Sequence, residues 1–264
     1  DSSKIFPNTD IKGGVAITYR DKILAFGEIG TFTIFDELNS ILHKTLNHLT
    51  FKNIIPIIYL QNKFNLECVY KDYPELRVVI GSQGREKRLT TPIFSQLFLF
   101  KEKKETKNDI GILGLIDNKR VYKYINNIYL EVNNNNLNYY KVVLPASNGS
   151  GALGEALSTP IVVEPNIGYT QSFISFGQFT SKIVAENCLK YIKSKFVRVL
   201  LGTLKITQHN HKDCWENVPL QDFTTNSDID WSQSIENIDQ QLYKKYDLSQ
   251  DEIDFIESKV RAMD

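Results

Sequence analysis

The sequence contains few sulfur-bearing residues and no long apolar run. It has three cysteines and one methionine in 264 residues, and Cys68, Cys188 and Cys214 are odd in number and widely separated. This pattern is typical of a reduced cytoplasm and argues against a disulfide framework. No apolar stretch approaches the roughly 20 residues that cross a bilayer, and residues 1–10 lack the basic and apolar regions of a secretory signal. We therefore expect a cytoplasmic protein with no membrane partner.

The motifs of several enzyme classes are also missing. The glycines at 81–84 lack the spacing and the following Lys-Ser/Thr of a phosphate-binding loop, and residues 147–151 lack the frame of a nucleophile elbow. His209, His211 and Cys214 are neighbours without a distant fourth ligand, whereas closed zinc sites draw ligands from two separated segments. The sequence therefore predicts no catalytic residues and no metal site.

The net charge of zero conceals an uneven distribution along the chain. Residues 81–107 contain seven basic and three acidic side chains, and residues 182–212 contain seven basic side chains and one acidic. Residues 213–264 contain thirteen acidic side chains and four basic ones. An acidic tail thus hides two basic segments, and such segregation permits a polyanionic partner.

The periodicity predicts an α+β fold. Residues 1–25 suggest a hairpin fragment, and residues 54–165 suggest an irregular, mostly β body with a polar hairpin tip at 133–136. The longest predicted helix covers residues 179–204, and Ser249 with Glu252 predicts a capping box on the last of the short C-terminal helices. We expect further helices at 36–48, 234–246 and 249–263, and strands at 54–60, 77–80, 93–100, 110–115, 127–131, 139–143 and 160–163.

Several segments resemble one family of proteins in order and in approximate spacing. Residues 5–15 (IFPNTDIKGGV) resemble the end of the catalytic domain in adenine-specific DNA methyltransferases of type II restriction–modification systems. Residues 191–198, 205–209, 218–223 and 242–257 resemble the recognition region that follows that domain in large single-chain enzymes. The match is strongest over about the last eighty residues and loose in the middle of the chain.

The chain departs from that family at the catalytic motifs. It has no Asn-Pro-Pro-Tyr type motif for the target adenine, and it lacks the glycine-bearing loop that binds S-adenosylmethionine. The resemblance therefore implies a carboxy-terminal fragment, whose methylase region would precede residue 1. It implies a remnant catalytic hairpin at 1–25, a DNA target-recognition domain at 26–223 and an acidic helical segment at 224–264. No activity is expected of the fragment alone, and S-adenosylmethionine is expected only in the parent enzyme, which could also carry an endonuclease.

A recognition domain must hold the phosphates of a duplex and present side chains to its major groove. By their chemistry, four cationic residues are assigned to phosphate contact: Lys193, Lys195, Arg198 and Lys205. Six others are candidates for base contact, since arginine suits guanine and asparagine or glutamine suits adenine: Arg85, Arg88, Asn148, Gln208, His209 and Asn210. Double-stranded DNA is the expected partner, and a restriction subunit is a possible one.

Two other classes of function remain open from the sequence. The chain could be a protein-interaction scaffold that docks a partner subunit through its acidic tail and last helices. It could also be an enzyme, a compact methyltransferase or nuclease, whose site has no recognisable motif. The sequence gives neither the DNA recognition sequence nor the oligomeric state.

Overall fold

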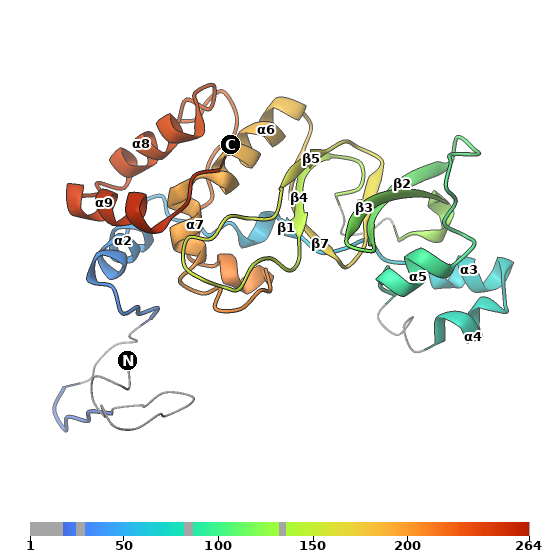
Figure 1. Ribbon diagram of the computed structural model, residues 1–264, viewed down its shortest axis with the longest axis horizontal. Helices are drawn as coiled ribbons and strands as arrows, with labels where there is room; N and C mark the ends of the chain where they lie inside the picture. The colour runs from blue at the N-terminus through green and yellow to red at the C-terminus, as the bar shows by residue number, and fades with distance from the viewer. Residues whose placement is uncertain (1–17, 25–29, 82–86, 132–135, 264) are drawn as a thin grey trace.

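The computed structural model describes residues 18–24, 30–81, 87–131 and 136–263. These residues form an α+β fold that is elongated in Figure 1, with most of the long helices at one end. Short strands occupy the middle of the molecule, and a smaller group of helices and strands forms the other end. We call the two ends, each with its adjoining sheet, the helical lobe and the small lobe.

The helical lobe contains a four-stranded sheet covered by helices. Its strands follow the order β1-β7-β4-β5, and every neighbouring pair is antiparallel. The strands are β1 (Ile58–Tyr59), β4 (Tyr140–Pro145), β5 (Ile161–Val163) and β7 (Phe173–Phe179). The helices are α2 (Asp36–Leu46), α6 (Lys182–Lys193), α7 (Lys195–Leu201), α8 (Ile235–Lys245) and α9 (Gln250–Lys259), with the 3-10 turns η1 (Ile55–Ile57) and η4 (Lys212–Trp215).

The small lobe is built on a three-stranded sheet of order β3-β2-β6. β2 (Asp109–Ile116) and β3 (Lys119–Asn126) form a hairpin, and β6 (Ile167–Tyr169) runs parallel to β2. Among its described residues, the lobe also contains three short helices and one 3-10 turn: α3 (Leu66–Asp72), α4 (Leu76–Ile80), α5 (Thr91–Gln96) and η3 (Asn127–Tyr129).

Each lobe has its own apolar core, and a third cluster joins them. The larger core surrounds Phe196 and Trp215, both fully buried, and the smaller surrounds Phe64 and Phe94. The joining cluster takes residues from both sheets: Leu113, Val143, Val163, Tyr169 and Phe173. Because these five side chains are nearly inaccessible to water, the two sheets are held together by burial as well as by the chain itself.

Several predicted strands of the small lobe are helices. Residues 77–80 and 93–100 were expected to be strands, but they contribute to α4 and α5. In α4 the buried residues Leu76 and Ile80 lie four positions apart, which is the helical spacing, while the β-branched residues between them are exposed. Of residues 127–131, Asn127–Tyr129 form η3 and Leu130 forms only an isolated bridge to Phe64, so the predicted strand is wrong for this part of the chain.

The strands of the two sheets were predicted unevenly. Those at 110–115, 139–143 and 160–163 are confirmed as β2, β4 and β5. Residues 54–60 supply only the two-residue strand β1 after a 3-10 turn, and β3, β6 and β7 were not predicted.

The predicted long helix at 179–204 is two helices separated by Ser194. Ser194 has extended backbone geometry with ψ 150°, and its hydroxyl accepts a hydrogen bond from the Val197 amide at 3.2 Å. It therefore ends α6 and caps α7, since a serine hydroxyl can satisfy an amide that the first turn of a helix leaves free. A continuous scaffold helix is thus wrong for this region.

The C-terminal helices are confirmed, and so is the capping box formed by Ser249 and Glu252. Ile238, Leu242 and Ile256 of α8 and α9 belong to the larger core, so the predicted boundary at residue 223 does not coincide with a break in that core. The predicted hairpin at residues 5–19 and most of the tip at 133–136 lie outside the described residues. None of the helices in the described parts of the chain is both long enough and apolar enough to span a bilayer.

Candidate nucleic-acid interface

Arg198, assigned from the sequence to phosphate contact, is 2% exposed. Its Nε donates to the Lys193 carbonyl at 3.0 Å, and Nη2 donates to the carbonyl of Arg261. Burial lowers the pKa of the guanidinium to about 10. The side chain ties α7 to the last described residues of the chain and is almost wholly buried.

The other basic residues of α6 and α7 are largely engaged within the protein. Lys195 forms an ion pair with Glu257 of α9, and Lys190 donates to the carbonyls of Trp231 and Gln233 at 2.8 and 2.9 Å. Lys193 is half-buried beside them. The acidic C-terminal segment thus lies against the basic helices that precede it, and the charge segregation seen along the sequence is much reduced in space.

Asp239 of α8 stabilises the start of α7. Its carboxylate accepts hydrogen bonds from the backbone amides of Lys195 and Phe196, at 3.0 and 2.9 Å. A carboxylate is favourable at this position because the first amides of a helix carry a partial positive charge. Burial nevertheless outweighs these bonds and raises the pKa of Asp239 to about 6.

Lys205 is 3% exposed and supports the loop that follows it. Its ammonium donates to Glu155 Oε1 at 2.6 Å and to the Asn148 carbonyl at 2.9 Å. Burial acts to raise the pKa of Glu155, but the Lys205 ammonium and the backbone amides of Ser150 and Gly151 outweigh it and lower that pKa. Lys205 is therefore a structural cation and does not present its charge to a ligand.

The segment at 147–151, which lacks the frame of a nucleophile elbow, approaches the chain's own backbone at residues 206–207. A Cβ on Gly151 would lie 2.5 Å from the Thr207 nitrogen, and Gly151 has φ +90°, a conformation that side chains other than glycine disfavour. The glycine is required for the two loops to pack against each other.

Asn148 and Asn210, two of the candidates for base contact, are also buried. The Asn148 backbone amide donates to the Gln208 carbonyl at 2.6 Å, and its side-chain Nδ2 donates to the Ala156 carbonyl at 2.9 Å. Asn210 Nδ2 donates to the Pro145 carbonyl at 2.9 Å, and its Oδ1 has no hydrogen-bond partner among the described residues. Both side chains hold the loop in place, and Asn210 also lines the cleft that the loop borders.

The exposed part of the region is the loop at residues 206–212, which we call the recognition loop. Gln208, His209 and His211 are exposed on it, and an isolated bridge pairs His209 with Ser147. The Ser147 hydroxyl lies 3.1 Å from His209 Nδ1, and the rings of the two histidines are 5.3 Å apart. Lys205, Asn148 and Asn210 support this loop from beneath. The loop is therefore held in place, and its exposed surface carries a carboxamide and two imidazole rings.

The recognition loop borders a cleft of about 750 Å³ at the junction of the two lobes. Its lining brings together residues far apart in the sequence, including the predicted residues Arg88, His209 and Asn210. The remaining lining residues are Leu60, Gln61, Lys63, Leu115, Pro145, Ala146, Ser147, Gln171, Ser172, Phe173, Ile174, His211 and Lys212. Among the described residues that line the cleft, none is aspartate or glutamate.

The chain segments that pass between the lobes hold the walls of this cleft. Tyr169, 1% exposed, donates its hydroxyl to the Leu60 carbonyl at 2.8 Å, and its oxygen lies 2.6 Å from the Ser175 hydroxyl. The backbone amide of Gln171 donates to the Leu89 carbonyl at 3.0 Å, and Lys63 and Arg88 form an isolated antiparallel β-bridge. The cationic residues of the small lobe are thereby fixed opposite the recognition loop.

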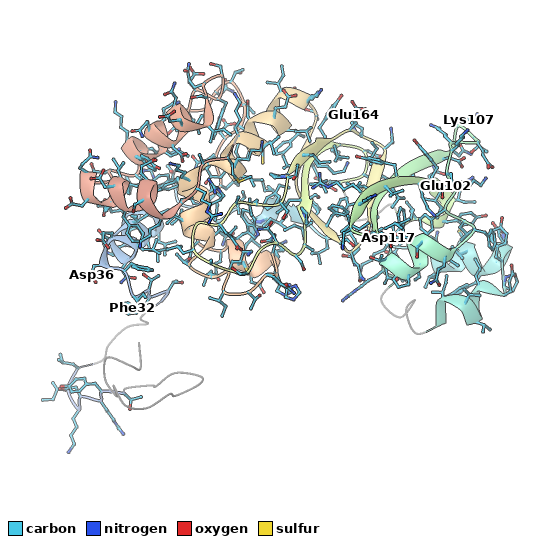
Figure 2. All side chains as sticks on the ribbon, in the orientation of Figure 1. Phe32, Asp36, Glu102, Lys107, Asp117 and Glu164 are labelled. Carbon is cyan, nitrogen blue, oxygen red and sulfur yellow. The ribbon has the colours of Figure 1, made fainter. Side chains whose placement is uncertain are left out.

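Lys63 and Lys212 line the cleft but were not among the predicted contact residues. Lys212 lies two positions after the predicted residue Asn210 and could have been included on that ground. No local signal marks Lys63, because its position depends on the isolated β-bridge to Arg88. Arg85 lies outside the described residues. Figure 2 shows Lys107, from the basic segment at 81–107, at the end of the small lobe that is farther from the helical lobe, and Lys107 does not line the cleft.

No group of three or more histidine, cysteine or acidic side chains is placed to hold a metal ion within the described ranges. His209, His211 and Cys214 therefore do not form a metal cluster, although the Cys214 thiol lies 3.8 Å from the His209 carbonyl. In comparisons with known proteins, no family model matches the chain, and no curated protein matches it either.

Proposed function

We propose that the protein recognises double-stranded DNA through the recognition loop and the cationic rim of the cleft. The observation that carries this proposal is the lining of the cleft, where Lys63, Arg88 and Lys212 gather with two histidines and no described carboxylate. A cleft lined by one sign of charge attracts a polyanion, because the potentials of its charges add. Cations of this kind position a duplex, and exposed amide and imidazole groups read its base edges.

The proposal keeps the target-recognition role suggested by the resemblance to adenine-specific DNA methyltransferases. Methylation would depend on S-adenosylmethionine bound by a region that carries the catalytic motifs. The residues proposed to contact DNA differ from those expected at first, because Arg198, Lys205, Asn148 and Asn210 serve as internal supports. Gln208 and His209 remain the proposed base-contact residues, and Lys63, Arg88 and Lys212 are the proposed phosphate contacts.

Binding of a labelled 20-base-pair duplex, followed by fluorescence anisotropy between 50 and 200 mM salt, tests the proposal. Each phosphate contact contributes about −0.9 to the slope of log affinity against log salt. Lys63→Glu and Lys212→Glu should each weaken binding to all sequences alike and reduce the magnitude of that slope by about 1. Gln208→Ala should instead change the preference between sequences.

Lys182→Glu is the matched control, since Lys182 is an exposed lysine at the start of α6, and its nearest acidic partner is Glu186 at 3.8 Å. The same change of charge there should leave affinity nearly unchanged. Equal weakening by all three charge reversals, or undetectable duplex binding at low salt, would refute the proposed surface. A calorimetric titration with S-adenosylmethionine adds a second check, because stoichiometric binding to this chain would contradict the assignment of methylation to another region.

A further inference from the structure

The cleft has an apolar floor as well as a cationic rim. The floor includes Leu60, Leu115, Pro145, Ala146 and Phe173. Leu60 is 57% exposed although it lies at the junction of the two lobes. An exposed aliphatic side chain inside a concave site is typical of a ligand site that is mostly apolar with a few polar groups at its edge.

The rim carries cationic and carboxamide side chains. Lys63 and Arg88 come from the small lobe, and Lys212 is the last residue of the recognition loop. Gln61 and Gln171 contribute carboxamides, which can donate and accept hydrogen bonds together, as base edges require. The arrangement therefore suits a flat, polar-edged ring that carries an anionic group.

The size of the cleft limits what can enter it. Its volume of about 750 Å³ lies within the roughly 300–1,000 Å³ of small-ligand sites and fits one nucleotide. A base that is outside a duplex stack can enter a site of this size as a single unit, whereas a stacked base is held between its neighbours.

We propose that this cleft binds a single nucleotide unit, with its base on the apolar floor around Leu60 and its phosphate at Lys63, Arg88 and Lys212. The unit can come from a free mononucleotide or from an unstacked position in a DNA strand. For the DNA source, the inference rests on the DNA-binding function proposed above. The contact with the floor is independent of base sequence, since every base has an apolar face.

The first arm of the test uses dAMP, adenosine and inorganic phosphate as separate probes in calorimetric titrations of the full chain. We expect dAMP to bind and to exceed the affinity of either adenosine or phosphate by about tenfold or more, because it alone engages both floor and rim. Leu60→Asp should weaken dAMP binding by about tenfold or more, because the apolar contact is lost and the new carboxylate repels the phosphate. Leu49→Asp is the matched control, because Leu49 is fully exposed at 102% and does not line the cleft.

The second arm compares two labelled duplexes of the same sequence, one fully paired and one with a single bulged adenosine. The bulged duplex should bind at least about fivefold more tightly to the wild type, since its extra base is already unstacked. Leu60→Asp should remove this preference, and Leu49→Asp should preserve it. The readout is the ratio of the two duplex affinities, because a carboxylate added to the cationic cleft should also weaken binding of the paired duplex. Circular dichroism of both variants confirms that the exposed substitutions leave the fold intact.

The outcomes separate this inference from the proposed function. If the paired duplex binds but neither dAMP nor the bulge is preferred, the nucleotide site is refuted and the DNA-binding function stands. If dAMP binds with the expected dependence on Leu60 while no duplex binds, the nucleotide site stands with a free nucleotide as its ligand. A bulge preference that survives Leu60→Asp would also overturn the inference, because the floor would then make no contact with the base.

Discussion

Replacing Lys205 with methionine tests whether the recognition loop depends on a buried ion pair. The substitution keeps the length and apolar stem of the side chain, but it removes the ammonium that contacts Glu155 Oε1 at 2.6 Å. Breaking a buried pair by removal of one partner costs about 3–5 kcal/mol. Because the Glu155 side chain retains 20% of its exposure, we expect the lower end of this range, about 3 kcal/mol of unfolding free energy.

The sign of the pH dependence follows from the lowered pKa of Glu155. A carboxylate with a folded-state pKa below its unfolded value contributes stability at neutral pH and loses it as the pH falls through the folded pKa. The difference in unfolding free energy between wild type and Lys205→Met should therefore have its maximum value at pH 7. It should narrow as the pH falls below the ordinary glutamate value of 4.5.

Urea unfolding followed by tryptophan fluorescence provides the assay, since Trp215 and Trp231 are both buried and become exposed on unfolding. A loss of about 3 kcal/mol corresponds to a fall in Tm of roughly 6–12 °C for a chain of this size. Glu155→Gln in the Lys205→Met background should recover part of the loss, because no unpaired charge remains. Lys182→Met should change stability by less than about 0.5 kcal/mol. A loss below about 1 kcal/mol for Lys205→Met would refute the role assigned to this pair.

Three further substitutions test other parts of the argument. Gly151→Ala should destabilise the protein by about 1–3 kcal/mol in thermal unfolding, because alanine disfavours φ +90° and its Cβ would meet the Thr207 nitrogen; an unchanged Tm would show that the loops can separate freely. Arg198→Met should leave duplex affinity within about twofold, because the guanidinium is buried; a large loss of affinity in a folded variant would return Arg198 to the DNA surface. Asp239 has a raised pKa of about 6, so its contribution to stability is present at low pH and lost as the pH rises through 6. In urea unfolding, Asp239→Asn should remove the loss of about 1–3 kcal/mol of unfolding free energy that the wild type shows between pH 4 and pH 7. If the variant kept the wild-type pH profile, that pH dependence could not come from Asp239.

The parts of the fold that sequence patterns predicted are those decided by local contacts. The strand β2 follows from an apolar run, and the capping box of α9 follows from two residues three positions apart. The patterns did not predict α4, because Val78 and Val79 favour strands by their intrinsic preference. Burial of Leu76 and Ile80 on one side overrides that preference.

Residue type alone could not show which of the candidate contact residues would be exposed. Gln208 and His209 lie on the exposed recognition loop, whereas Lys205 is a buried support. Lys205 meets Glu155 fifty positions earlier, and Arg198 meets the carbonyl of Arg261 sixty-three positions later. Such contacts depend on tertiary packing, and periodicity carries no information about them.

The way in which the chain alternates between the two lobes has a consequence for protein engineering. The small lobe takes residues 61–131 before the chain returns to β4 and β5, and it then takes β6 before the chain returns again to β7. No single excision can therefore remove this lobe intact. A chimaera that replaces this lobe with another must exchange two separate segments of the chain in register. It must also keep the hydrogen bonds that the Tyr169 hydroxyl forms with the Leu60 carbonyl and the Ser175 hydroxyl.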